Sequence, residues 1–171
     1  MAVELPPEVI EELVRLQKEI RQEGLRLVKD FHLTLKFLGE VSDPKIERIK
    51  EKLGEISFGK FEAELSETGI FPNPNYIRVI WAGIKADQIY SLQKAIDSSL
   101  EKLGFQRERD FKPHLTLARV DFIKDKVAFK NKLTLLKINN LKFGINEFKL
   151  IKSTLTPTGP VYEVLESVRA Q

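Results

Sequence analysis

The sequence predicts an α+β fold whose sheets are largely antiparallel. Helical and strand patterns alternate along the chain, and the last two strand patterns flank a short loop, as in a hairpin. A second observation is an internal repeat, because the segment His-Leu-Thr-Leu at residues 32–35 returns at residues 114–117, about half the chain later. This spacing predicts two related lobes within a single domain that covers residues 1–171.

Three segments carry an apolar stripe at helical spacing. The first begins after Pro6-Pro7 and ends at Gly24, the second has Asp43 as its N-cap, and the third ends at Gly104. The stripes consist of Ile10, Leu13, Val14 and Ile20, of Ile46, Ile49 and Leu53, and of Ile89, Leu92, Ile96, Leu100 and Leu103. A short fourth helix is expected within residues 124–138, where the pattern is weaker.

Strand patterns alternate with these helices. They lie at residues 31–37, 61–66, 76–82, 114–120, 148–155 and 161–168. The turn cluster 72–75 precedes the third strand, and the loop 156–160 joins the last two. Within residues 31–37, strict alternation predicts that Phe31 and Phe37 are buried together with the leucines, while His32 and Thr34 share the opposite face.

Composition excludes several classes of site. The 171 residues include no cysteine and two histidines, so disulfides, cysteine-ligated metals, a thiol nucleophile and a three-histidine metal site are excluded. The net charge of +3 permits an anionic partner but is too small for a protein that coats nucleic acid. No apolar run is long enough for a membrane span and no signal-peptide pattern is present, so a cytoplasmic location is expected. Richness in Lys, Glu and Ile favours a thermophile.

Both histidines lie in the repeated motif, which points to acid–base chemistry on a phosphodiester. On each strand the imidazole and the threonine hydroxyl share a face, at His32 and Thr34 and at His114 and Thr116. Two histidines can serve as base and acid, and hydroxyl groups can donate to the non-bridging phosphate oxygens. Arg119, at the end of the second strand, could add charge-assisted contacts. No metal or cofactor is required.

Simpler interpretations compete with the catalytic one. A single strand histidine is more often a hydrogen-bonded structural residue, and only the pairing of the two motifs reverses that balance. A surface ion pair is as good an explanation of Arg119 as a phosphate contact. Trp81 is a better candidate for the core than for a base-stacking surface.

The chain resembles the 2H phosphoesterase superfamily and, within it, the LigT-like RNA 2′,3′-cyclic phosphodiesterases, also called 2′-5′ RNA ligases. The segments that carry the resemblance are residues 31–40, 71–83, 113–119 and 152–162. It implies a bilobal fold with antiparallel sheets around a V-shaped cleft and helices outside. It further implies hydrolysis of RNA 2′,3′-cyclic phosphate ends to 2′-phosphate ends, with His32 as proton donor and His114 as proton acceptor, and a reverse 2′-5′ ligation.

The resemblance also sets expectations about partners. An RNA with a cyclic phosphate end, such as a tRNA half, or a small cyclic nucleotide would be the substrate of a monomeric enzyme. The chain departs from the family at its start, where Met1-Ala-Val-Glu-Leu5 replaces a longer strand, so the first sheet is expected to lack part of that strand.

Two other functions fit parts of the pattern. A non-catalytic nucleotide- or RNA-binding module on the same fold would keep the binding groups but needs no paired acid and base. A metallophosphatase would use the two histidines with carboxylates, yet neither motif has an Asp or Glu beside its histidine. Assays of cyclic phosphate turnover with and without a chelator separate the three functions. The acid–base enzyme keeps its activity in the chelator, the metallophosphatase loses it, and the binding module has none in either case.

Overall fold

A computed structural model describes residues 1–157 and 159–171. The helices are α1 (Pro7–Ile20), α2 (Asp43–Gly54), α3 (Asp87–Glu101) and α4 (Lys126–Leu135). The strands are β1 (Ala2–Val3), β2 (Leu25–Leu27), β3 (Leu33–Thr34), β4 (Phe61–Asn73), β5 (Tyr76–Lys85), β6 (His114–Val120), β7 (Lys142–Ile145), β8 (Glu147–Thr156) and β9 (Gly159–Arg169).

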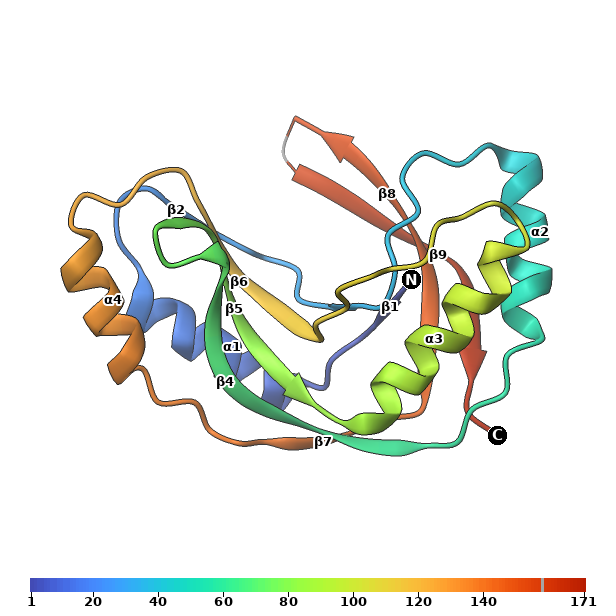
Figure 1. Cartoon of the computed structure of the whole chain (residues 1–171), viewed down its shortest axis with the longest axis horizontal. Helices are drawn as coiled ribbons and strands as arrows, with labels where there is room; N and C mark the ends of the chain where they lie inside the picture. Colours follow the sequence, from blue (N-terminus) through green and yellow to red (C-terminus); the bar gives the residue numbers. More distant parts are fainter. Residues whose placement is uncertain (158) are drawn as a thin grey trace.

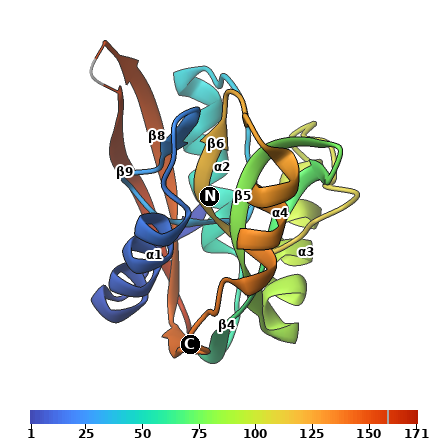
Figure 2. The ribbon, with the colours of Figure 1, turned by 90° about the vertical axis from the view of Figure 1, so that its left-hand side faces the viewer.

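The strands form two antiparallel sheets. One has the order β3-β1-β8-β9 and the other β2-β6-β5-β4-β7. Helices α2 and α3 contact each other and α2 contacts β9, whereas α1 contacts β6. The β8–β9 hairpin stands apart from the five-stranded sheet in two perpendicular views (Figures 1 and 2). The arrangement confirms the predicted bilobal α+β fold.

The two halves of the chain repeat the same order of elements and exchange one strand. The first half runs β1, α1, β3, α2, β4, and the second runs β5, α3, β6, α4, β8, with β2, β7 and β9 as additions. In one sheet β1 lies between β3 and β8, and in the other β5 lies between β6 and β4. Each half therefore supplies the third strand of the other half's sheet.

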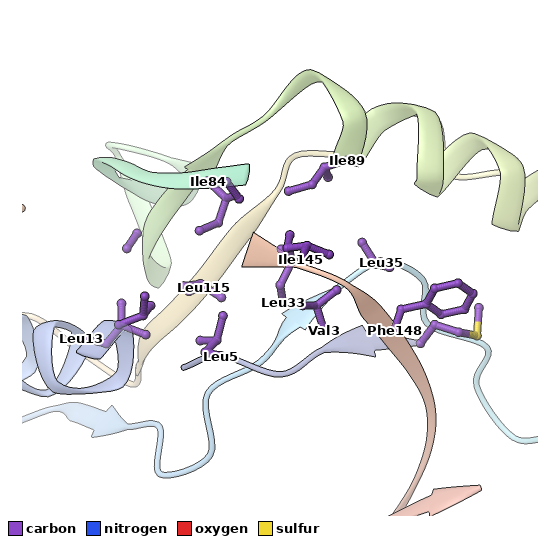
Figure 3. Packing of buried hydrophobic residues seen from close by; sticks show 14 of the residues in the cluster. Val3, Leu5, Leu13, Leu33, Leu35, Ile84, Ile89, Leu115, Ile145 and Phe148 are labelled. Carbon is purple, nitrogen blue, oxygen red and sulfur yellow. The ribbon is translucent and has the colours of Figure 1, made fainter. Parts of the chain in front are cut away.

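A continuous core joins the two sheets. It includes the leucines of both histidine motifs together with residues from α1, α3 and β8. Figure 3 shows Leu33 and Leu115 in this core, with Val3 beside Leu33 and Ile84 on the side of Leu115. Because both motifs pack into one cluster, their backbones are held relative to each other by close-packed side chains.

The structure corrects several predicted details. The strand expected at residues 31–37 is only Leu33–Thr34. The shortened first strand is β1, Ala2–Val3, and the short strands β2 and β7 were not predicted. Ile10 is exposed, because Val9 and Leu16 complete the buried face of α1. Ser42, not Asp43, is the N-cap of α2. The predicted short helix within 124–138 is confirmed as α4. Residue 158, in the predicted loop 156–160, lies outside the described residues.

Candidate active site

The two His-Leu-Thr-Leu segments show the same order of burial. In each, the leucines are fully buried and the histidine and threonine are half-buried. His114 and Thr116 lie on β6, whereas Thr34 lies on β3 and His32 directly precedes it. Strands β3 and β6 are in contact although they belong to different sheets. The structure thus brings the two motifs into one part of the molecule, with their leucines inside and their polar groups outside.

A β-bulge in β6 follows the second motif. The residue opposite Trp81 is Thr116 and the residue opposite Ile80 is Ala118, so Leu117 has no counterpart in β5. Leu117 and Ala118 are both fully buried. An inserted residue shifts the alternation of side chains by one position.

The bulge returns Arg119 to the face that carries the histidine. Arg119 is exposed and lies opposite Val79, which shares a face of β5 with Trp81 and Gly83. Gly83 and Trp81 are themselves opposite His114 and Thr116. Without the bulge, the odd spacing from His114 would direct the guanidinium into the core.

At the end of the first motif two consecutive backbone N–H groups share one acceptor, and one prediction is wrong there. The backbone N–H groups of Leu35 and Lys36 both donate to the carbonyl oxygen of Met1, at 2.9 and 3.3 Å. Lys36 is consequently buried, and Phe37, which strict alternation placed in the core, is 83% exposed. Phe31 is only half-buried. Phe37 and Arg119 thus occupy corresponding exposed positions beside the two motifs.

The His114 ring is held by groups on three sides. Its Nδ1 donates to the carbonyl oxygen of Lys112 at 2.7 Å. The ring of Phe71 lies 5.0 Å from it at an interplanar angle of 87°, and the Trp81 ring lies 6.2 Å away. The Lys112 ammonium sits 4.2 Å from the Trp81 ring centre. These contacts fix the orientation of the imidazole and leave Nε2 as its proton acceptor.

His32 lies beside a backbone group in a similar way. The backbone of Asp30, also two residues earlier in the chain, interacts with its imidazole and favours the charged form. The Tyr162 ring packs against it edge-on, with centroids 5.5 Å apart and planes at 70°. Burial lowers the pKa of His32 below its usual value, and the positive charge of the Met1 amino group acts in the same direction. The neutral imidazole is therefore favoured in the absence of an anion.

Sequence reasoning missed three of these neighbours. Phe71 and Tyr162 lie far from the motifs in the chain, and strand pairing alone brings them to the histidines. The role of the Lys112 carbonyl has no side-chain signal at all. Trp81 is 3% exposed, so it is buried as predicted, but it packs against Phe71 and His114 on the histidine face of β5 and does not belong to the shared core.

Two further findings concern metal-binding groups and membrane-spanning helices. Among residues 1–157 and 159–171, no group of three or more His, Asp or Glu side chains is placed to hold a metal ion. In the same part of the chain, no helix has the length and apolar character needed to cross a membrane.

Comparison with known proteins identifies the family. A family model described as LigT-like phosphoesterase matches residues 3–81 and again residues 84–162. The chain belongs to the LigT-like phosphoesterases. The double match reflects the internal repeat, and it confirms the family that the motifs predicted.

Relatives of this LigT-like protein match it along nearly its whole length. An RNA 2′,3′-cyclic phosphodiesterase of Methanocaldococcus jannaschii is 39% identical over 169 residues, covering 97% of this chain and 96% of that protein. One of Archaeoglobus fulgidus is 37% identical, covering 96% of each. A crystal structure of a Thermus thermophilus protein superposes with a TM-score of 0.83 at 31% identity, covering 98% of this chain and 94% of that one.

Escherichia coli LigT in complex with 3′-AMP has a TM-score of 0.80 to this LigT-like chain at 26% identity. The match covers 99% of this chain and 95% of LigT. The fold comparison therefore agrees with the sequence comparison over both lobes.

Proposed function

We propose that the protein hydrolyses RNA 2′,3′-cyclic phosphate ends to 2′-phosphate ends without a metal ion. The observation that carries the proposal is the pair of His-x-Thr motifs with equal burial on two strands in contact, with the His114 imidazole fixed by the carbonyl oxygen of Lys112. The names of the archaeal relatives support the same substrate. General acid and base groups are what cleavage of a phosphodiester at neutral pH requires.

In the proposed reaction, water attacks the phosphorus atom and the bond from phosphorus to the 3′ oxygen breaks. Nε2 of His114 accepts the proton of the attacking water. His32, whose charged form is favoured once the anionic phosphate lies beside it, donates a proton to the leaving 3′ oxygen. The hydroxyl groups of Thr34 and Thr116 donate hydrogen bonds to the non-bridging oxygens, where negative charge increases in the transition state. Arg119 adds a charge-assisted contact to the same phosphate.

The asymmetry between the two motifs would orient the nucleotide. The corresponding exposed positions hold an aromatic ring at Phe37 and a guanidinium at Arg119. An aromatic ring stacks on any base, typically with about 1–3 kcal/mol, and a guanidinium prefers phosphate. We therefore infer that the terminal base lies at Phe37, beside the proton donor, and the phosphate lies toward Arg119.

The test uses a short oligonucleotide with a 2′,3′-cyclic phosphate end in the presence of EDTA. Wild-type protein should release a 2′-phosphate end, and His32→Ala or His114→Ala should each reduce the rate about 10²–10⁴-fold. Phe37→Ala, purified in the same way, serves as the comparison variant and should keep most of the rate of chemistry. Full activity of either histidine variant would contradict the mechanism.

The same assay separates the alternatives. Binding of a nucleotide monophosphate without turnover would support a binding module, and loss of activity in EDTA would support a metallophosphatase. Substrates of different length would distinguish tRNA halves from small cyclic nucleotides. The reverse 2′-5′ ligation, the monomeric state and the cytoplasmic location stay predictions, which ligation assays, sedimentation and cell fractionation would test.

A further inference from the structure

A buried lysine continues the first histidine motif. Lys36 is 5% exposed, and its ammonium group lies 2.5 Å from Oδ1 of Asp97 on α3. The same group donates to the backbone carbonyl oxygen of Gln106 at 2.6 Å. A buried ammonium needs such partners, because an unpaired charge away from water is costly.

Asp97 extends the contact to the loop that enters the second motif. Its Oδ2 accepts from the side-chain amide of Gln93 at 2.8 Å and from the backbone N–H of Glu108 at 2.9 Å. Gln106 and Glu108 both belong to the segment 102–113, which connects α3 to β6. One ion pair therefore links the end of the first motif to the loop that precedes His114.

The far end of that loop carries the groups that hold His114. The Lys112 carbonyl accepts from the imidazole, and its ammonium covers the Trp81 ring. The Phe111 ring packs edge-on against Tyr90 at 5.8 Å, so the loop is also anchored to α3. A displacement of the loop would move the hydrogen-bond acceptor of the His114 ring.

The second copy of the motif shows that the fold does not need a charge here. The position that corresponds to Lys36 is Ala118, which is also fully buried beside its bulge. Replacing a buried ion pair by apolar residues is often neutral or stabilising. The Lys36–Asp97 ion pair in the first copy is therefore better explained by a role in fixing the position of the neighbouring loop than by a contribution to the stability of the fold.

We propose that the Lys36–Asp97 ion pair is a positioning device that holds the segment 102–113 against the first motif and thereby sets His114 relative to His32. The proposal rests on the catalytic roles proposed above for the two histidines. Neither Lys36 nor Asp97 touches the substrate in this scheme, and both act through the Lys112 carbonyl.

The test compares two double variants of the full chain. Lys36→Met with Asp97→Leu removes the device. Glu12→Leu with Arg15→Met is the matched control, because Glu12 is equally buried, at 5% exposed, and binds Arg15 and Asn139, which lies in a loop away from the histidines. Both variants should keep a cooperative thermal transition. The first should lose about 10–10²-fold in kcat, as expected when reacting groups are displaced, and the control should lose less than about threefold.

Two readouts are independent of activity. Trp81 is the only tryptophan, so quenching of its fluorescence by acrylamide reports whether Lys112 still covers it. Nitrogen-15 NMR of His114 reports whether the Nδ1–H tautomer persists. In the first variant quenching should increase and the tautomer should become mixed, with neither change in the control. These readouts test the positioning role even if the wild-type chain hydrolyses no cyclic phosphate.

A second double variant covers the case in which the first does not fold. Lys36→Met with Asp97→Asn removes both charges but keeps the shape of residue 97 and an acceptor for Glu108, and it should show smaller changes of the same sign. A folded Lys36→Met/Asp97→Leu variant with wild-type kcat, quenching and tautomer would overturn the proposal. Equal losses in the Glu12 control would overturn it as well. If Lys36→Met/Asp97→Leu does not fold, a Lys36→Met/Asp97→Asn variant without any change would also overturn it.

Discussion

The leucines, histidines and threonines of the two motifs have different roles, which substitutions can separate. The leucines are buried in the shared core, the backbone two residues earlier orients His114, and the Tyr162 ring packs against His32. The threonine side chains are half-buried and lie on the face opposite the leucines, so their hydroxyl groups contribute nothing to that core. Substitutions that leave the carbon skeleton in place can therefore separate the chemical roles from the structural ones.

Replacing each threonine by valine tests the hydroxyl contacts. Thr34→Val and Thr116→Val keep the β-branched shape, so strand pairing should be retained. If the hydroxyls donate to the phosphate in the transition state, each change should lower kcat about 10²-fold. Steady-state kinetics on the cyclic phosphate oligonucleotide gives the comparison, and a change confined to KM would assign the threonines to substrate binding only.

The pKa of His32 should lie below that of an unfolded histidine, near 6.5, because burial disfavours the imidazolium. Two histidines give two imidazole signals in a proton NMR titration, and His32→Ala assigns them. Since the unfolded chain binds more protons between the two pKa values, the contribution of His32 to the free energy of unfolding is complete above about pH 6.5. It decreases as the pH falls through the folded pKa. A titration above the unfolded value would show that burial does not dominate.

At the scale of elements, the surroundings of His114 depend on how closely β4 and β5 approach. Gly69 on β4 is opposite Trp81 on β5, and a Cβ atom at Gly69 would lie 2.1 Å from the Trp81 ring. The indole can therefore lie across the neighbouring strand and support both Phe71 and His114. The absence of a side chain at Gly69 is thus a requirement of the histidine's packing.

Gly69→Ala should consequently displace Trp81. We expect a loss of about 1–3 kcal/mol in the free energy of unfolding, as for other overpacked sites, together with a shift in tryptophan fluorescence. Gly144→Ala on β7 is the control, because a Cβ atom there meets nothing within 4 Å. Urea denaturation followed by circular dichroism measures both variants. Equal stability of the two would mean that the ring moves aside at no cost.

At the scale of the whole molecule, the exchanged strands make the two lobes interdependent. Strand β8 completes the sheet of the first motif, and β4 completes the sheet of the second. The core is likewise shared between the sheets. The repeat in the sequence therefore does not correspond to two separable units, although the family model matches the chain twice.

Cutting the chain in the β4–β5 turn tests this interdependence. Fragments 1–74 and 75–171 each contain one histidine motif but lack the exchanged strand, so each alone should remain unfolded. Mixed in equal amounts, the fragments should regain circular dichroism and, if the proposed function holds, activity toward the cyclic phosphate. The uncut chain should unfold in one transition. A fragment that folds cooperatively by itself would contradict the single-domain prediction.

Sequence and tertiary structure determined different parts of this description. Helical spacing predicted α3 well, because this helix buries a regular stripe against the core, and alternation predicted the bounds of β6 but not its bulge at Leu117. The short strand β2 could not be predicted, since a strand of three residues exists only through its partners. The same limit explains the error at Phe37, because the Met1 carbonyl oxygen that accepts from both Leu35 and Lys36 lies far from them in the chain.

The sequence by itself determined which side chains are available for catalysis. They are two histidines, each followed by a threonine on the same strand face, in a chain with no cysteine. Local periodicity suffices for this, because it depends only on neighbouring residues. Tertiary structure alone decided which groups pack on those histidines, that Phe37 is exposed and Arg119 shares a face with His114, and that Lys36 and Asp97 join the two motifs. These contacts connect residues far apart in the chain, and strand pairing and close packing, rather than sequence pattern, bring them together.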